Sequence, residues 1–480
     1  MNRKESLSLA LLLTSSIFAA CSGKPGGVVC PPAGCVVGGN GSVLVTVTST
    51  PSQTFFFPSL EWAISSVQLL NSGTGATIVA GALPPVDFAR LQTDSQLLGK
   101  ALSPVPAGAY TSAKIQLAPS TAASYFYNSS NATLLGCAPA TVCQIPNTVV
   151  GFGQTTVTVP VNFTVIANSN VGFSLNFDLS KAVTSTGGMT FDFTKSGAIT
   201  LSTLPRQGQS SGSLDSLQNF TGNVTAVTGT TSISMASLSS DTRTFTMAAT
   251  VEFDDPFGIC TPPASFSCIA VNQNLSVDAV INSDGTLTAY EVEFLDKFAQ
   301  ETEGIIVTPV TNNQFKMVVT NGMGTTFLPG TLATVNVNGT STYFLDPKNL
   351  GITNITAPLG FASSTDLVMG QAVMLLGGSA NFTNNSLSGY TRTLLRYSSI
   401  GGTIQTPNGT IFTLSGVSPF FTNLVTNSVQ VQTFANTTYD NITGGFSGLA
   451  IGTNASVRGL YLNPTSGATQ PLLAAKVRAH

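Results

Sequence analysis

Apolar and polar residues alternate with a period of two along most of this 480-residue chain. The alternation is clearest at 43–47, 157–165 and 173–179, where valine, leucine or phenylalanine takes every second position. Such alternation is typical of half-buried antiparallel strands. The best candidate for a helix, Ser213 to Phe220, is short and has two leucines three positions apart. We therefore predict an all-β fold.

Turn residues divide the strands into a first domain over 41–205 and a divergent repeat after it. The repeat units are predicted at 219–297, 302–397 and 398–480. Each opens with a strand directly after a glycine, at Gly222, Gly304 and Gly402. The middle unit diverges most, since its ending at 394–396 fits the pattern poorly.

Four short motifs follow one another inside the first domain: 86–91, Leu97-Leu98-Gly99, Pro106 to Tyr110, and 114–117. Pro106 and Gly108 predict a turn, after which Tyr110 can lay its ring against the core with its hydroxyl near the surface. In this order the motifs resemble domain of unknown function 4382, a β-sandwich-like module of exported lipoproteins. The chain departs from that family in lacking Asp-Ala-Pro after the first strand, and in an insertion that contains Cys137 and Cys143.

The repeat units resemble a second family, domain of unknown function 5666, which is a small β-barrel. The resemblance implies about three OB-like modules behind the sandwich-like domain. A spacing of roughly 80 to 100 residues suits closed five-stranded barrels, which leave few open edges. One large β-sandwich, or a solenoid with coincidental similarities, is the alternative.

The N-terminus carries the pattern of an export signal. Arg3 and Lys4 precede an apolar stretch that ends in Ala-Ala-Cys21, too short to span a bilayer. This resembles a bacterial lipoprotein signal, which implies that residues 1–20 are removed and that Cys21 is acylated. An ordinary signal peptide is the alternative. Residues 21–40 are rich in glycine and proline, so we expect a flexible tether, and Ser22 in place of aspartate favours the outer membrane by the same resemblance.

Six cysteines remain once Cys21 is assigned to lipid, and they fall into three close pairs. Export places them in an oxidising compartment, so local pairing is the simplest connectivity. Metal binding is the alternative, but the spacings are not CxxC and no histidine accompanies them. The expected disulfides are Cys30 with Cys35, Cys137 with Cys143, and Cys260 with Cys268.

Composition excludes several functions. Charged residues are only 8% of the chain, against about 25% in ordinary soluble proteins. A net charge of −3 gives no basic field for nucleic acid. The single histidine, His480, is the last residue. Ser-His-Asp triads, Cys-His pairs, histidine zinc sites and haem ligation through an internal histidine are therefore excluded. We expect a frayed end there, no cofactor and no metal.

Carboxylates and aromatics are the remaining candidates for a site. Two acidic clusters, one of Glu252, Asp254 and Asp255 and one of Glu291, Glu293 and Asp296, could serve glycan hydrolysis by two carboxyl groups, or bind calcium. The ordinary interpretation is a turn at Asp255 and the solvent face of a strand at Glu291 and Glu293.

Among the aromatics, Trp62 is expected in the core, because it alternates with other apolar residues. Tyr125, Phe126 and Tyr127 are the better candidates for exposed ligand contacts. The run 55–57 is either a sticky loop or a buried strand.

These features favour a non-catalytic cell-envelope protein, held at the membrane by an N-terminal lipid and carrying its modules outward as a binding, scaffold or adhesion array. The expected ligand is a polysaccharide or a protein, and not a nucleic acid. One alternative is a carboxylate-dependent enzyme that acts on glycans. The other is an integral outer-membrane β-barrel, although threonine and serine stand where such a barrel has lipid-facing leucine and aromatic girdles.

Overall fold

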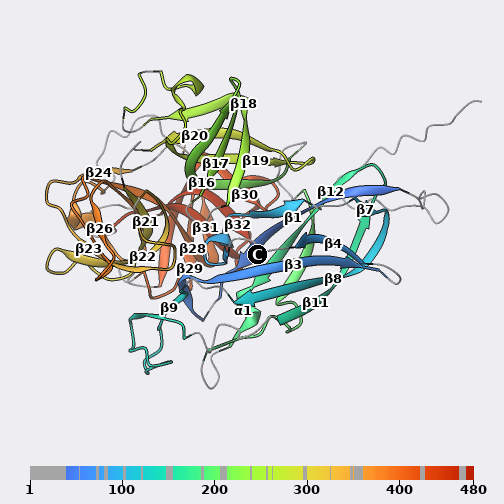
Figure 1. Ribbon diagram of the computed structural model, residues 1–480. Coiled ribbons are helices and arrows are strands. Elements are labelled where there is room, and N and C mark those ends of the chain that lie inside the picture. The colour runs from blue at the N-terminus through green and yellow to red at the C-terminus, as the bar shows by residue number, and fades with distance from the viewer. Residues whose placement is uncertain are drawn as a thin grey trace, which may run out of the picture.

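The computed structural model shows a chain that is almost entirely β-strand (Figure 1). It describes residues 39–480 except for 53, 72–74, 81–84, 101–103, 120–122, 147–154, 185–188, 206–212, 238–240, 256–257, 262, 296–299, 325, 346–349, 351–359, 422–426 and 464–471. The predicted all-β fold, a sandwich-like domain followed by small barrels, is confirmed. The signal, Cys21, most of the tether and the pair Cys30–Cys35 lie outside the described residues. No helix in the described ranges is both long and apolar enough to cross a membrane.

The N-terminal domain packs two sheets around one apolar core. The first sheet has the order β15 (Ile199–Leu204), β12 (Asn170–Asp178), β1 (Asn40–Thr50) and β6 (Gln96–Lys100), with β7 (Val105–Pro106) also on β1. The second has the order β11 (Thr155–Val165), β8 (Gly108–Pro119), β3 (Glu61–Leu70) and β4 (Gly75–Ala80), with β5 (Val86–Asp87) also on β3. The core prediction for Trp62 is confirmed, since its side chain is buried in this cluster.

Smaller elements complete the sandwich. They are β2 (Phe56–Ser59), β9 (Tyr125–Tyr127) and β10 (Val142–Gln144) in one sheet, β13 (Val183–Thr184) with β14 (Thr190–Phe191), the helix α1 (Leu179–Ala182) and the 3-10 turn η1 (Arg90–Gln92). Tyr110, the third residue of β8, has a buried ring, and its hydroxyl donates to the Pro106 carbonyl at 2.8 Å. This bond ties the turn to the outgoing strand.

Barrel 1 is a closed five-stranded barrel in the order β16-β17-β18-β20-β19. Its strands are β16 (Ser213–Thr228), β17 (Ser232–Ala236), β18 (Thr242–Asp254), β19 (Asn274–Asn282) and β20 (Leu287–Phe294). The best helix candidate, Ser213 to Phe220, is a strand, because this segment pairs with β19. Register shifts in that pairing, one of them between Leu217 and Phe220, bring apolar residues three apart to the same core.

Barrel 2 repeats the same pairing scheme. It is formed by β21 (Glu301–Ile306), β22 (Gln314–Met323), β23 (Leu332–Asn336), β24 (Thr342–Leu345), β25 (Ala372–Leu376) and the start of β28 (Arg392–Asn408). Residues 392–396 of β28 run parallel to β24 and antiparallel to β25. The ending that fitted the repeat poorly therefore closes this barrel. A hairpin of β26 (Ser379–Asn381) and β27 (Ser386–Ser388) extends it beside β23.

Barrel 3 begins in the same strand that ends barrel 2. Residues 397–403 of β28 pair with β31 (Asn454–Tyr461), and the following residues pair with β29 (Ile411–Ser415). The chain continues through β30 (Ser428–Asp440) and β32 (Leu472–Ala479), and the strand order matches that of barrel 1. The boundary expected between 397 and 398 thus falls inside one continuous strand.

The faces of β28 serve two different cores. Leu395 and Tyr397 belong to the core of barrel 2, whereas Ile400 and Ile404 belong to that of barrel 3. Successive residues of a strand point to opposite faces. The odd-numbered residues Leu395 and Tyr397 therefore face the core of barrel 2, and the even-numbered Ile400 and Ile404 face that of barrel 3.

The barrels pack against the sandwich and do not extend away from it as the expected outward array would (Figure 1). Phe56 of β2 stacks on Phe420 of barrel 3, with 4.3 Å between ring centroids. Gly330 of barrel 2 approaches so closely that a Cβ there would lie 2.6 Å from the Ala123 carbonyl oxygen. Contacts of this kind join the four domains into one body.

Candidate ligand-binding site

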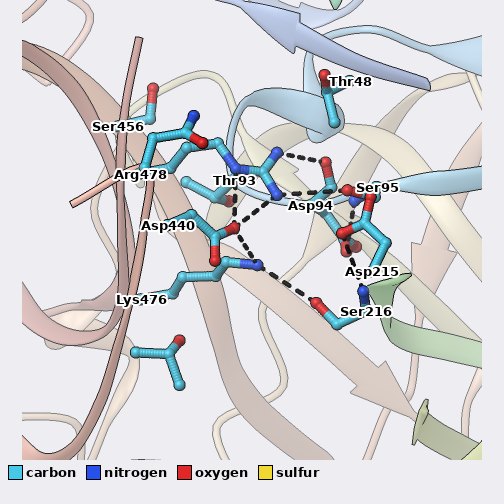
Figure 2. A network of polar contacts seen from close by, with 12 residues as sticks. Thr48, Thr93, Asp94, Ser95, Asp215, Ser216, Asp440, Ser456, Lys476 and Arg478 are labelled. Carbon is cyan, nitrogen blue, oxygen red and sulfur yellow. Dashed lines mark hydrogen bonds and ion pairs between the residues drawn. The ribbon is translucent and has the colours of Figure 1, made fainter. Parts of the chain in front are cut away.

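A buried ion network lies where barrel 3 meets the sandwich (Figure 2). Lys476 and Arg478 stand on β32, and both side chains are almost fully buried. The Asp440 carboxylate, at the end of β30, accepts from Lys476 Nζ at 2.9 Å and from Arg478 Nη2 at 2.8 Å. Burial alone would raise the pKa of Asp440, but the two cations outweigh it and hold that pKa well below its ordinary value.

The same network reaches two other domains. Arg478 Nη1 donates to the Asp94 carbonyl at 2.7 Å, and its Nη2 donates to Ser95 Oγ at 3.3 Å, both in the sandwich. Lys476 Nζ lies 3.5 Å from Ser216 Oγ in barrel 1. Figure 2 shows these contacts converging on Asp440 and Arg478 from three directions. The network therefore fixes the relative positions of the domains.

A second buried ion pair joins barrels 1 and 2. Arg396 Nη1 on β28 lies 2.6 Å from Glu293 Oε2 on β20, and its Nη2 lies 3.4 Å from Asn219 Oδ1. The expectation that Glu291 and Glu293 face solvent is wrong, since their exposed fractions are 7% and 4%. The strand alternation itself is present, but contacts between the barrels cover the outer face on which Glu293 stands.

A cavity of about 510 Å³ opens beside these ion pairs, where the sandwich meets barrels 1 and 2. Small-molecule sites have volumes of about 300 to 1,000 Å³, so this cavity is large enough for one. Its walls combine carboxyl, guanidinium, amide and hydroxyl groups with leucine, phenylalanine, proline and alanine side chains. Lining residues include Glu61, Asp87 and Arg90 of the sandwich, Asn219 and Arg243 of barrel 1, and Thr320 and Asn321 of barrel 2.

Two carboxyl groups in the wall stand directly opposite each other. Glu61 of β3 is the register partner of Asp87 of β5, which places their Cβ atoms about 5 Å apart. Burial, and then repulsion from Asp87, raise the pKa of Glu61 to about 8. Burial also raises the pKa of Asp87, although the Leu60 and Ala89 backbone N–H groups donate to its carboxylate. At neutral pH Glu61 is therefore protonated and can donate a hydrogen bond into the cavity.

A second cavity, of about 70 Å³, adjoins the first and shares Arg90, Asp94, Asn219 and Thr320 with it. Arg458 of β31 lines this smaller cavity and is 4% exposed. Its guanidinium carbon lies 4.6 Å from the centroid of the Tyr397 ring. Neither Nη atom has a hydrogen-bond partner within the described part of the chain. Arg458 thus differs from Arg478, whose guanidinium is bonded throughout.

The aromatic residues proposed as exposed ligand contacts are buried. Tyr125, Phe126 and Tyr127 have exposed fractions of 5%, 0% and 3%. Phe126 packs edge-on against Phe55, and Tyr127 packs edge-on against Phe420 of barrel 3. The prediction that this triplet is exposed is wrong, because β9 lies between the sandwich core and barrel 3. The run 55–57 is likewise not a sticky exposed loop.

The acidic candidates near 252–255 lie outside the cavity lining. The Asp255 carboxylate accepts from the backbone N–H groups of Ile259 and Cys260, at 2.8 and 2.6 Å, so it caps a turn as the ordinary interpretation expected. Glu252 belongs to β18 and does not line the cavity. Asp296 lies outside the described residues.

The cysteines and the histidine that are described have structural partners. Disulfides join Cys137 to Cys143 and Cys260 to Cys268, with Cα–Cα distances of 5.8 and 5.7 Å. This is the local pairing expected from their spacing. His480 is held against barrel 3 and is not frayed, because its Nε2 lies 2.8 Å from Ser456 Oγ. Across the ranges that the structure describes, no three His, Cys, Asp or Glu side chains form a group able to hold a metal ion.

Glu61, Asp87 and Arg458 were not identified from the sequence as site residues. One signal was present: Glu61 begins a largely apolar strand and Arg458 lies inside another, where charge is seldom buried without a reason. The pattern could not show that the two strands meet at adjoining cavities.

Comparison with known families gives one finding. The model described as "Domain of unknown function (DUF5666)" matches residues 221–293, which lie in barrel 1. The resemblance expected for that unit is confirmed there. No curated protein matches the sequence.

Proposed function

We propose that this chain is a non-catalytic binding protein of the cell envelope, anchored through an acylated Cys21 in the outer membrane. The observation that carries the proposal is the cavity whose polar and apolar walls come from the sandwich and two barrels, next to an ion network that fixes the domains. A cavity built on packed domains presents its polar groups in place, which lowers the entropic cost of binding.

A sugar unit of an envelope polysaccharide suits this cavity better than a protein surface does. The cavity is recessed, and its size fits one or two sugar rings. Amide and hydroxyl side chains can pair with sugar hydroxyls, while Leu97, Leu217 and Phe220 in the lining can contact the apolar face of a ring.

Ligand binding is tested by the thermal unfolding of the full mature chain with a set of neutral and acidic monosaccharides and disaccharides. Thr320→Trp should fill the cavity and abolish any ligand-induced rise in Tm, because Thr320 lines both cavities. Lys316→Trp, on the same strand and exposed, is the matched control and should keep the rise. The proposal is contradicted if no sugar raises Tm, or if Thr320→Trp responds as the control does.

Anchoring is tested separately by cell fractionation. Cys21→Ala should release the protein from the membrane fraction, whereas the double variant Cys30→Ala, Cys35→Ala should stay bound. Retention of the Cys21→Ala protein in the membrane would argue against lipid as its only anchor. Protease treatment of intact cells then distinguishes the surface from the periplasmic face.

A carboxylate-dependent glycan-acting enzyme is the second candidate. The observation that favours it is Glu61, a carboxyl group with a pKa of about 8 in a cavity wall opposite Asp87, since perturbed carboxyl groups in clefts are typical of acid–base sites. Release of reducing sugar ends by the wild-type chain, and its loss in Glu61→Gln, would establish this function. If the wild-type chain releases no reducing sugar ends from envelope polysaccharides, the enzymatic function is rejected.

A further inference from the structure

We propose that the two adjoining cavities form one site for a carboxylate-bearing sugar, whose carboxylate binds Arg458 while its ring lies in the larger cavity. This inference rests on the proposed function and specifies the ligand of the same site. It follows from the one described guanidinium that is deeply buried, lines a cavity and has both Nη atoms without a hydrogen-bond partner.

The Arg458 guanidinium attracts the buried carboxyl group of Asp94 and so opposes the rise in the pKa of Asp94 that burial causes, but its two Nη atoms make no hydrogen bond within the described residues. Burying a charge without hydrogen bonds opposes folding, and the other deeply buried arginines have such bonds. Arg478 donates to a carboxylate, to carbonyls and to a hydroxyl, and Arg396 contacts Glu293 at 2.6 Å. A guanidinium that lines a cavity and whose Nη groups make no hydrogen bond within the fold can donate those hydrogen bonds to a ligand.

The geometry of Arg458 matches a carboxylate. The guanidinium presents its two Nη groups as a planar fork, which pairs with two carboxylate oxygens at once. The Tyr397 ring, 4.6 Å from the guanidinium carbon, restricts the orientation of that plane. A volume of about 70 Å³ equals the share of about two water molecules in the liquid, which suits a carboxylate group and not a whole ring.

The side chains around the smaller cavity carry charges of both signs, which disfavours a doubly charged ligand group more than a singly charged one. Arg90 and Arg458 line it, and so do the carboxyl groups of Asp94 and Glu303. A phosphate monoester carries nearly two negative charges at neutral pH and would meet stronger repulsion from the two acidic side chains. A carboxylate carries one.

The ring has room in the larger cavity directly beyond. Arg90, Asp94, Asn219 and Thr320 border both cavities, so a ligand passing this group of residues would occupy both. Ser95, Thr221 and Asn321 add hydroxyl and amide groups to the larger one. A sugar has hydroxyls for these groups and C–H faces for the leucines beside them.

Isothermal titration calorimetry of the full mature chain at pH 7 tests the ligand class, with D-glucuronate, D-glucose and glucose 6-phosphate as probes. Glucuronate should bind at least about tenfold more tightly than glucose, which corresponds to one charge-assisted hydrogen-bonded pair. Arg458→Met should remove this preference. Equal affinity for glucose and glucuronate, or tighter binding of glucose 6-phosphate, would overturn the inference.

Stability without ligand tests whether Arg458 is merely structural. Arg458→Met should lower Tm clearly less than Arg478→Met does, because only Arg478→Met removes side-chain hydrogen bonds that hold the domains together. Equal loss of Tm in the two variants would assign Arg458 to folding and overturn the inference.

Failure of this inference can be told apart from failure of the proposed function. If Thr320→Trp blocks sugar binding but Arg458→Met leaves it unchanged, the cavity binds sugar and the proposed contact between Arg458 and a ligand carboxylate is rejected. Lack of any sugar response in the wild-type chain would reject both.

Discussion

Replacing Asp440 by asparagine removes the charge on which the ion network converges, with almost no change of shape. Lys476 Nζ and Arg478 Nη2 lie 2.9 and 2.8 Å from Asp440 Oδ2. At such distances each pair attracts by about 6 kcal/mol with an effective dielectric constant of about 20. Desolvation of the three charges offsets most of this attraction, so the intact network contributes little net stability. The variant keeps the desolvation of two cations and loses the charge that compensates it.

We therefore expect Asp440→Asn to lower the free energy of unfolding by about 3 to 5 kcal/mol, as measured by urea unfolding at pH 7. Because the folded-state pKa of Asp440 lies below its ordinary value, its contribution is present above the unfolded-state pKa and is lost as the pH falls through the folded-state pKa. The difference in the free energy of unfolding between Asp440→Asn and wild type should therefore become smaller only below about pH 4. Asp284→Asn, at an exposed turn, is the control. Equal urea midpoints for Asp440→Asn and wild type would refute the reasoning.

Three other changes test the cavity, the domain contact and a disulfide. Glu61→Gln should flatten the pH dependence of stability. Because the folded-state pKa of Glu61 is raised to about 8, this carboxyl group's contribution to wild-type stability is fully present below about pH 4.5 and is lost as the pH rises to about 8, by on the order of 1.4 kcal/mol for each pH unit between the two pKa values. The same pH dependence of urea unfolding in the variant and the wild type from pH 5 to 9 would contradict this. Phe420→Ala should cost about 3 to 5 kcal/mol in urea unfolding, because this buried ring joins two domains, whereas Phe382→Ala, at a ring that is 56% exposed, should cost far less. Changing both Cys137 and Cys143 to serine should cost about 2 kcal/mol, and a reductant should then have less effect on unfolding than it has on wild type.

Local patterning was enough to predict the fold class. Alternation identified the strands because one face of each is buried within its own domain, as Val157 and Val159 show in β11. The segment near Leu217 resembled a helix because a register shift in the strand produces the spacing of a helix turn. Periodicity cannot distinguish a bulge from a helix over eight residues.

The candidate site was far less predictable, because it depends on contacts between domains. Tyr127 and Glu293 stand on faces that their own domains leave open, and a neighbouring domain covers both. Nothing in a single strand pattern specifies such a neighbour. Arg458 and Glu61 lie far apart in the sequence, and they line adjoining cavities only once the sandwich and barrels have docked.

The strand β28 runs without a break from barrel 2 into barrel 3, and its pairing partners change between residues 396 and 397. A fragment that starts at 404 would deprive β31 of its partner strand in barrel 3, while a chain that ends at 391 would leave barrel 2 without its closing strand. A single residue inserted at Ser398 would turn Ile400 and Ile404 away from the core of barrel 3. Exchange of modules at this joint therefore has to preserve the number of residues in β28, so that each side chain keeps facing its own core.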